Sequence, residues 1–145
     1  MSRTDRAGKR RAREAALQML YHWEIGRCGA HEAIATYWPA HDPAGEVGED
    51  LRTFANGLVH GVVERVAELD QLIAARAVNW RVERMAVIDR MILRLAVFEL
   101  KGDADTPPKV VINEAIELAR TYSGDESVAF VNGVLDAVRR DLNRE

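Results

Sequence analysis

The spacing of the apolar residues constrains the fold of this chain more than any other feature of its sequence. Apolar residues recur every three or four positions, without the apolar-polar alternation that is typical of a half-buried β-strand. Such spacing gives a helix one apolar face that packs against a core. The clearest stripe consists of Leu51, Phe54, Leu58, Val62, Val66 and Leu69. The sequence therefore predicts an all-α fold.

We expect six or seven helices with short breaks between them. A break is expected at Trp38-Pro39, because a residue before proline avoids the helical conformation. Residues 82–100 are apolar on more than one face and are expected to form the central helix. The breaks fall at or near residues 26, 38–45, 68–70, 79–81, 101–108 and 123–125.

A chain of 145 residues is long enough for one domain, which we expect to consist of two packed helical subdomains, about 1–78 and about 79–145. Cys28 is the single cysteine, which excludes an intrachain disulfide and a cysteine zinc site. The longest run without a charged residue, 53–63, is too short to span a membrane. A cytoplasmic protein without membrane association is the expectation.

The sequence lacks the motifs that support common enzymatic chemistry. It has no glycine-rich phosphate loop, no HExxH motif and no G-x-S-x-G motif. His31-Glu32 begins like a zinc motif, but Ala35 stands where the second histidine would be needed. We therefore expect no enzymatic activity, no cofactor and no metal site.

Positive charge is concentrated at the N-terminus of an acidic chain. Residues 1–14 contain six arginines and lysines against two acidic residues, whereas the whole chain has a net charge of −3. On a helix, Arg6, Arg10 and Arg13 share one face. We expect this face to be exposed and to meet successive phosphates, which the planar guanidinium group binds with two hydrogen bonds. The alternative is a solvated helix end without a function.

Three blocks of sequence resemble the NusB family of bacterial transcription antitermination factors. Residues 9–23 (KRRAREAALQMLYHW) resemble its first helix, and residues 107–119 (PPKVVINEAIELA) resemble the stretch before its last helix. Residues 127–136 (SVAFVNGVLD) resemble the last helix itself, and residues 88–100 are similar to its central helix. Residues 27–50 match the family poorly.

The resemblance implies two small helical bundles without catalytic activity. It implies binding of boxA, a short single-stranded RNA signal in ribosomal RNA transcripts. NusE, a ribosomal protein of the small subunit, would bind together with the RNA, and the pair would help assemble an RNA polymerase complex that resists termination.

The resemblance also implies which residues contact these partners. Those expected to bind RNA are Lys9, Arg10, Arg11, Arg13, Gln18, Tyr21, Glu126 and Phe130. Asp89 and Arg94 are expected to face NusE. Tyr21 and Phe130 have two interpretations, because an aromatic side chain on a helix either stacks on an RNA base or belongs to the core.

Two further interpretations remain beside the RNA-binding factor. The chain could be a helical protein-interaction module, or a homodimer that covers the basic helix, without specific RNA binding. NusB-like domains also occur in RNA cytosine methyltransferases, but we expect no such activity, because the chain contains no nucleotide-binding loop.

Overall fold

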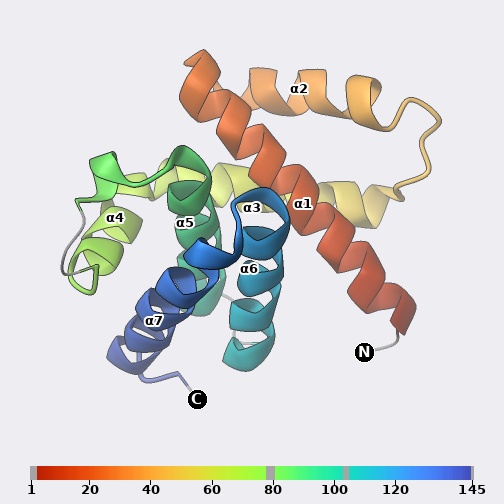
Figure 1. The fold of residues 1–145 in the computed structure, drawn as a ribbon. Coiled ribbons are helices and arrows are strands. Elements are labelled where there is room, and N and C mark those ends of the chain that lie inside the picture. Colours follow the sequence, from red (N-terminus) through yellow and green to blue (C-terminus); the bar gives the residue numbers. More distant parts are fainter. Residues whose placement is uncertain (1–2, 78–80, 103–104, 145) are drawn as a thin grey trace. The chain divides into compact units, whose positions relative to one another are not determined.

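The computed structural model describes residues 3–77, 81–102 and 105–144. Over these residues it contains seven α-helices, one short 3₁₀ turn and no strand, which confirms the predicted all-α class (Figure 1). No helix in these ranges is long and apolar enough to cross a membrane.

The chain divides into two compact units, residues 1–63 and 64–145. The first contains α1 (Arg3–Gly26), α2 (Ala30–His41) and nearly all of α3 (Glu49–Glu64). The second contains α4 (Val66–Ala74), a 3₁₀ turn η1 (Val82–Arg84), α5 (Val87–Gly102), α6 (Pro108–Tyr122) and α7 (Asp125–Asp141). The sequence placed the division near residues 78 and 79, but α4 belongs to the second unit because it packs against α5 and α7.

Small residues let α1 pack closely in the first unit. Ala12, Ala15 and Ala16 are fully buried, and α2 packs against α1. The two helices meet where α1 ends and α2 begins, and diverge from there (Figure 1). A Cβ atom on Gly8 would lie 2.7 Å from Cδ1 of Leu51, so the close approach of Leu51 to α1 requires a glycine or a shift of the leucine side chain.

The predicted break at Trp38-Pro39 is wrong, because α2 continues through Pro39 to His41. Trp38 is buried, and its Nε1–H donates to Oδ1 of Asn56 on α3 at 3.0 Å. Proline costs most in the interior of a helix, and Pro39 stands in the last turn. Packing of Trp38 therefore outweighs the local preference of a residue before proline.

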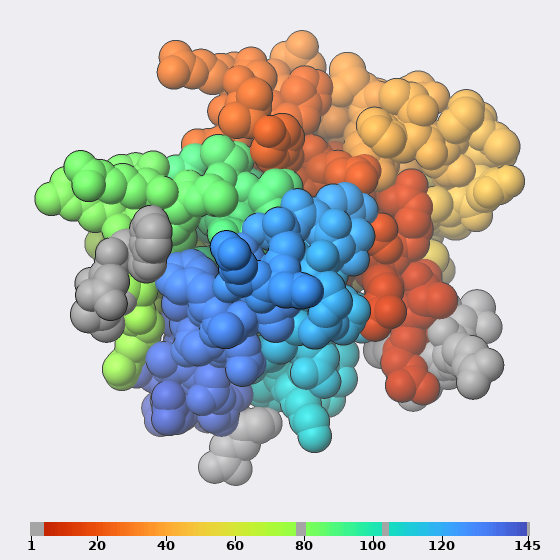
Figure 2. All heavy atoms as spheres, in the orientation of Figure 1, coloured from red at the N-terminus to blue at the C-terminus, as the bar shows by residue number. Residues whose placement is uncertain are grey.

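The second unit is built around α5, as its apolar sequence predicted. This helix contacts α4, α6 and α7, and most of its residues are buried. The predicted helix over residues 82–100 is divided, because η1 comes first and α5 starts at Val87. The break between α3 and α4 falls at Arg65, earlier than predicted. The turn from α6 into α7 is exposed on the face drawn in Figure 2.

Candidate nucleic-acid interface

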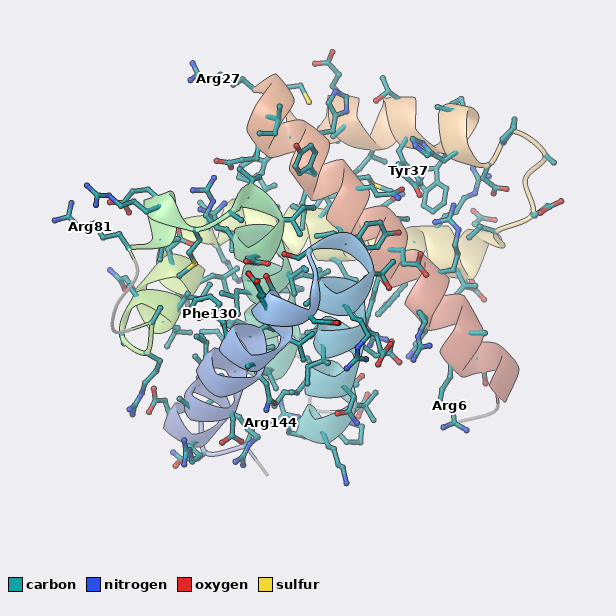
Figure 3. All side chains as sticks on the ribbon, viewed as in Figure 1. Arg6, Arg27, Tyr37, Arg81, Phe130 and Arg144 are labelled. Carbon is teal, nitrogen blue, oxygen red and sulfur yellow. The ribbon has the colours of Figure 1, made fainter. Side chains whose placement is uncertain are left out.

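The basic residues near the start of α1 differ in exposure. Arg6 and Arg10 are exposed, and Figure 3 shows Arg6 pointing away from the helix. Lys9 and Arg11 are half-buried. The side chains from Ala12 onward on this part of α1 are less exposed because the helix enters the packed part of the chain there, and Ala12 is fully buried.

Arg13 is buried, contrary to the expectation that it shares an exposed face with Arg6 and Arg10. Its relative exposure is 4%. The helical spacing of these arginines is as predicted, but Ala12, Ala15 and Ala16 are fully buried around Arg13, so this turn of α1 is covered on more than one face. A phosphate cannot reach Arg13 as it reaches an exposed arginine.

Lys9 and Arg13 both lie near the ring of Phe54 on α3. Lys9 Nζ is 5.2 Å and Arg13 Cζ is 5.5 Å from the ring centroid, within the range of a cation–π interaction. An open hollow of about 730 Å³ beside the ring is lined by Lys9 and by three acidic residues, Asp5, Glu49 and Asp50. These carboxylates oppose an RNA phosphate, which makes the hollow a poor site for the RNA backbone.

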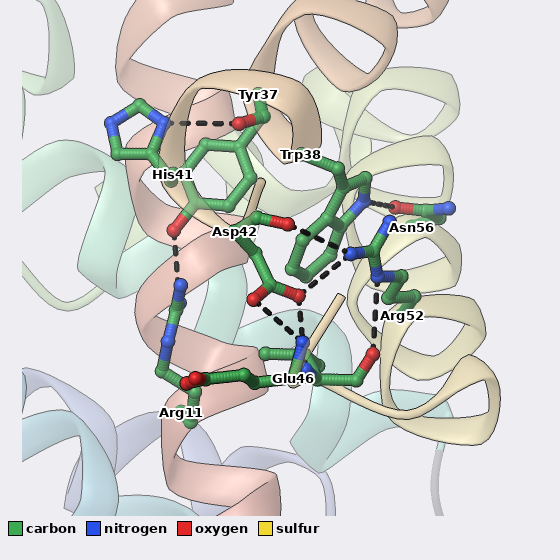
Figure 4. Close-up of polar contacts among 9 residues, drawn as sticks. Arg11, Tyr37, Trp38, His41, Asp42, Glu46, Arg52 and Asn56 are labelled. Atoms are coloured by element: carbon green, nitrogen blue, oxygen red, sulfur yellow. Dashed lines mark hydrogen bonds and ion pairs between the residues drawn. The ribbon is translucent and has the colours of Figure 1, made fainter. Parts of the chain in front are cut away.

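Arg11 and Gln18 are brought together by Tyr37 of α2, and Figure 4 shows the contact between Arg11 and Tyr37. Arg11 donates from Nη1 to the Tyr37 hydroxyl at 2.9 Å, and this hydroxyl donates to Oε1 of Gln18 at 2.8 Å. Tyr37 is 5% exposed. Arg11 and Gln18, which were predicted to bind RNA, are thus joined by Tyr37, which was not predicted to belong to the site.

Asp42 holds the connection that follows α2 (Figure 4). Its carboxylate accepts hydrogen bonds from the backbone N–H groups of Glu46 and Val47, each at 2.9 Å, and from Arg52 at 2.6 Å. The Val47 N–H is the main cause that lowers the pKa of Asp42, and Arg52 and the Glu46 N–H act in the same direction against the effect of burial. The Arg52 guanidinium also lies 4.8 Å from the Trp38 ring, so Arg52 links the connection after α2 to Trp38.

Tyr21 is exposed and is not a core residue. Its relative exposure is 41%, and Ile25, one turn further along α1, is 55% exposed. The interpretation of Tyr21 as a buried aromatic is therefore wrong, and its ring is accessible to a stacking partner.

In the second unit, three of the predicted residues surround one pocket of about 470 Å³. Asp89 of α5 and Glu126 and Phe130 of α7 line it, together with Met85, Ala86 and Ser127. Glu126 is exposed, and Phe130 is half-buried. Phe130 is thus at the edge of the core with part of its ring facing the pocket.

Both carboxylate oxygens of Asp89 accept hydrogen bonds from serines, one at the end of α6 and one in the first turn of α7. Ser123 donates to Oδ1 at 2.7 Å and Ser127 to Oδ2 at 2.9 Å, and the two serine hydroxyls are 2.7 Å apart. These bonds fix the first turn of α7 to α5. Asp89 therefore also has a structural role within this unit.

Arg94 lies away from that pocket and is not an exposed group. It is 7% exposed and donates from Nε and Nη2 to the two carboxylate oxygens of Asp70 on α4, at 2.8 and 2.7 Å. This bidentate pair connects α5 to α4. Direct contact with a partner, as predicted, would require the buried guanidinium to leave its ion pair with Asp70, so its position favours a structural role.

Sequence reasoning missed Tyr37 and the contacts of Phe54. Tyr37 lies in the segment 27–50 that resembles the family poorly, and its contacts reach 26 and 19 residues back along the chain. No local pattern contains such contacts. Phe54 was recognised as part of an apolar stripe, but the periodicity does not show that its ring faces two cations. Among the described residues, no group of three or more histidine, cysteine or acidic side chains is placed to hold a metal ion.

The comparison with known families gives one match over most of the chain. A model described as the NusB family matches residues 10–140. A protein of Koribacter versatilis, named transcription antitermination protein NusB, is 45% identical over 137 residues, which cover 94% of this chain and 92% of that protein.

Solved structures give the same result. The crystal structure of T. maritima NusB is similar with a TM-score of 0.81 and 32% identity, covering 92% of this chain and 91% of the other. A structure of the antitermination factors NusB and NusE in complex with double-stranded RNA is similar with a TM-score of 0.81 and 25% identity, covering 93% and 98%.

Proposed function

The chain belongs to the NusB family, and on that premise we propose that it acts as a transcription antitermination factor. In this role it binds the boxA RNA of ribosomal RNA transcripts together with NusE, and it helps to assemble a processive RNA polymerase complex. The similar structure that holds NusB with NusE and RNA supports both partners. The role consists of binding rather than catalysis and is carried out in the cytoplasm, where the transcript is made.

One observation carries the RNA-binding part of the proposal: α1 presents cations and an accessible aromatic ring. Arg6 and Arg10 are exposed, Arg11 is half-buried, and the Tyr21 ring is exposed further along the helix. Proteins that bind single-stranded RNA combine cations for the phosphates with aromatic rings on which bases stack. The second unit adds Glu126 and Phe130 at their own pocket, where part of the Phe130 ring is accessible.

The charge of the chain supports a need for NusE. The net charge is −3, and the basic residues at the start of α1 are a small part of an acidic protein. Repulsion between the acidic residues and the RNA backbone lowers the affinity of the chain alone. We propose that NusE completes the RNA-binding surface, with Asp89 as the candidate NusE-facing residue and Arg94 supporting α5 from within.

The alternative is a helical interaction module or a homodimer that covers α1, without specific RNA binding. Exposed Tyr21 and Ile25 would suit a protein contact on α1, whereas the Tyr21 ring would also suit stacking on an RNA base. A measurement of molar mass in solution and of RNA preference distinguishes the alternatives.

The test is a titration of labelled boxA RNA with this protein, with and without NusE, against a scrambled RNA of equal length. We expect tighter binding to boxA, enhanced by NusE. The Arg10→Ala variant should bind about threefold to tenfold more weakly at low salt, and its slope of log K against log salt should fall by about 0.7 for one lost phosphate contact.

The matched control is Arg140→Ala, which removes an exposed arginine near the end of α7. It should leave both the affinity and the salt slope unchanged. Equal binding to boxA and scrambled RNA, lost with salt in both cases, would contradict the proposed function and favour the interaction module or the homodimer.

A further inference from the structure

The Tyr37 hydroxyl contacts Arg11 of α1 as a neutral hydrogen-bond acceptor. An arginine that pairs with a carboxylate, as Arg52 does with Asp42, has its charge offset locally. A hydroxyl oxygen orients a guanidinium without offsetting its charge. Since a guanidinium has five N–H donors, one bond to Tyr37 leaves donors with which Arg11 can bind a phosphate.

The direction of the hydrogen bonds places the Tyr37 hydroxyl in a defined orientation. A tyrosine hydroxyl has one hydrogen, which points to Oε1 of Gln18, so a lone pair faces Nη1 of Arg11. Arg11 and Gln18 are seven residues apart, which is about two turns of one helix face. The single hydroxyl oxygen of Tyr37 therefore connects two side chains that come from different turns of α1.

The ring of Tyr37 is held by its neighbours on α2. The His41 ring stacks on it with a centroid distance of 4.2 Å and an angle of 8° between the planes. The Trp38 ring packs edge-on at 4.9 Å and is fixed in turn by Asn56 and Arg52 (Figure 4). A buried and immobilised ring gives the hydroxyl a fixed position against α1.

We propose that Tyr37 is a positioning residue for RNA binding, which holds the Arg11 guanidinium in place for a phosphate of the RNA backbone. The inference rests on the proposed function and adds to it a residue that was not predicted from the sequence. A long flexible side chain loses rotamer entropy when it is immobilised by a ligand. Tyr37 restricts Arg11 before the RNA arrives, so less entropy is lost on binding.

The experiment combines Tyr37→Phe and Arg11→Ala in a double-mutant cycle, with boxA RNA and NusE as the ligands. Tyr37→Phe removes the hydroxyl and keeps the ring, so the melting temperature should change little. We expect it to weaken RNA binding about threefold to tenfold, the equivalent of one hydrogen bond. In the Arg11→Ala background the same substitution should have no further effect.

The salt dependence separates positioning from direct contact. Tyr37→Phe should keep the wild-type slope of log K against log salt, because Arg11 still reaches its phosphate. Arg11→Ala should reduce the slope by about 0.7. Thr36→Val is the matched control, since it removes a neighbouring hydroxyl of α2 that bonds to the backbone of Glu32 and Ala33 rather than to Arg11. It should leave RNA binding unchanged.

Two results would overturn the proposal and leave the proposed function intact. These are wild-type affinity of Tyr37→Phe for boxA, or a loss of equal size with and without the Arg11 side chain. If the wild-type protein does not distinguish boxA from scrambled RNA, the proposed function fails and this inference fails with it.

Discussion

Arg11 in the first unit and Arg94 and Arg76 in the second are held in different ways. In the first unit, Arg11 contacts the Tyr37 hydroxyl, and Arg13 lies over the Phe54 ring. In the second unit, Arg94 is paired with Asp70, and Arg76 with Asp141. Aromatic rings and hydroxyls orient a cation while its full charge persists, whereas a carboxylate offsets that charge. Tyr37 thus orients Arg11 without offsetting its charge, whereas Arg94 and Arg76, like Arg52 in the first unit, pair with carboxylates that connect parts of the chain.

The largest expected loss of stability follows from replacing Arg94, the buried arginine that pairs with Asp70. Arg94→Ala removes one partner of the bidentate pair and leaves Asp70, which is partly exposed. Breaking a buried ion pair typically costs 3–5 kcal/mol, and the exposure of Asp70 places this one near the lower end, at about 3 kcal/mol. Urea unfolding followed by circular dichroism measures the change.

The control for Arg94→Ala is Arg120→Ala, which breaks an exposed pair with Glu117 within α6. Exposed pairs of this type contribute about 0–1 kcal/mol. Equal small losses in the two variants would show that the Arg94 pair is not a structural connection, and would return Arg94 to the list of partner-facing residues.

A smaller loss of stability is expected when the ring of Phe54, which faces two cations, is removed. Phe54→Leu keeps an apolar side chain on α3 but removes the ring near Lys9 and Arg13. Because Arg13 is buried, we expect a loss of about 1–2 kcal/mol of unfolding free energy. A double-mutant cycle with Arg13→Met should show coupling between the two positions.

Phe98→Leu is the matched variant in the second unit, where Arg65 lies 5.9 Å from the ring centroid with its side chain half exposed. Because Arg65 is farther from its ring and more exposed than Arg13, we expect Phe98→Leu to lower the free energy of unfolding less than Phe54→Leu does. Additive effects of Phe54→Leu and Arg13→Met would contradict a cation–π contribution at α1.

The smallest expected effect is the pH dependence of the exposed pair between Arg76 and Asp141. The hydrogen bond from Arg76 is the main cause that lowers the pKa of Asp141 in the folded protein. A lowered pKa stabilises the fold at pH values above the unfolded value of about 3.9, and this stabilisation is lost as the pH falls through the folded value. Thermal unfolding of the wild type and of Arg76→Gln should therefore differ slightly at pH 7 and converge in acid.

Arg81→Gln provides the comparison for that experiment, because Arg81 is exposed and precedes η1. It should unfold like the wild type at every pH. A difference between the wild type and Arg76→Gln that persists at pH 2 would rule out the Asp141 charge as its source.

Local patterns predicted the helices well and their limits less well. Apolar spacing identified the helical class and the central position of α5, which the structure confirms. The break at Trp38-Pro39 was wrong because burial of Trp38 and its bond to Asn56 outweigh a local preference. Local rules describe neighbours in sequence, and this helix end is decided by a residue of α3.

The candidate site shows the same division between local and distant causes. Helical periodicity placed Arg6, Arg10 and Arg13 on one face, but whether a face is covered depends on what packs against it. Arg13 is buried and Arg10 is exposed for that reason. Tyr37 was not predicted, since the residues it joins on α1 are distant in sequence.

The sequence by itself determined the helical class, the concentration of cations at the start of the chain and the resemblance to the NusB family, because these depend on periodicity, composition and short blocks of residues. The tertiary structure alone decided which of those cations are exposed, which rings and carboxylates contact them, and to which unit α4 belongs. The physical reason is that solvent exposure and the partner of a charge depend on contacts between residues that are far apart along the chain.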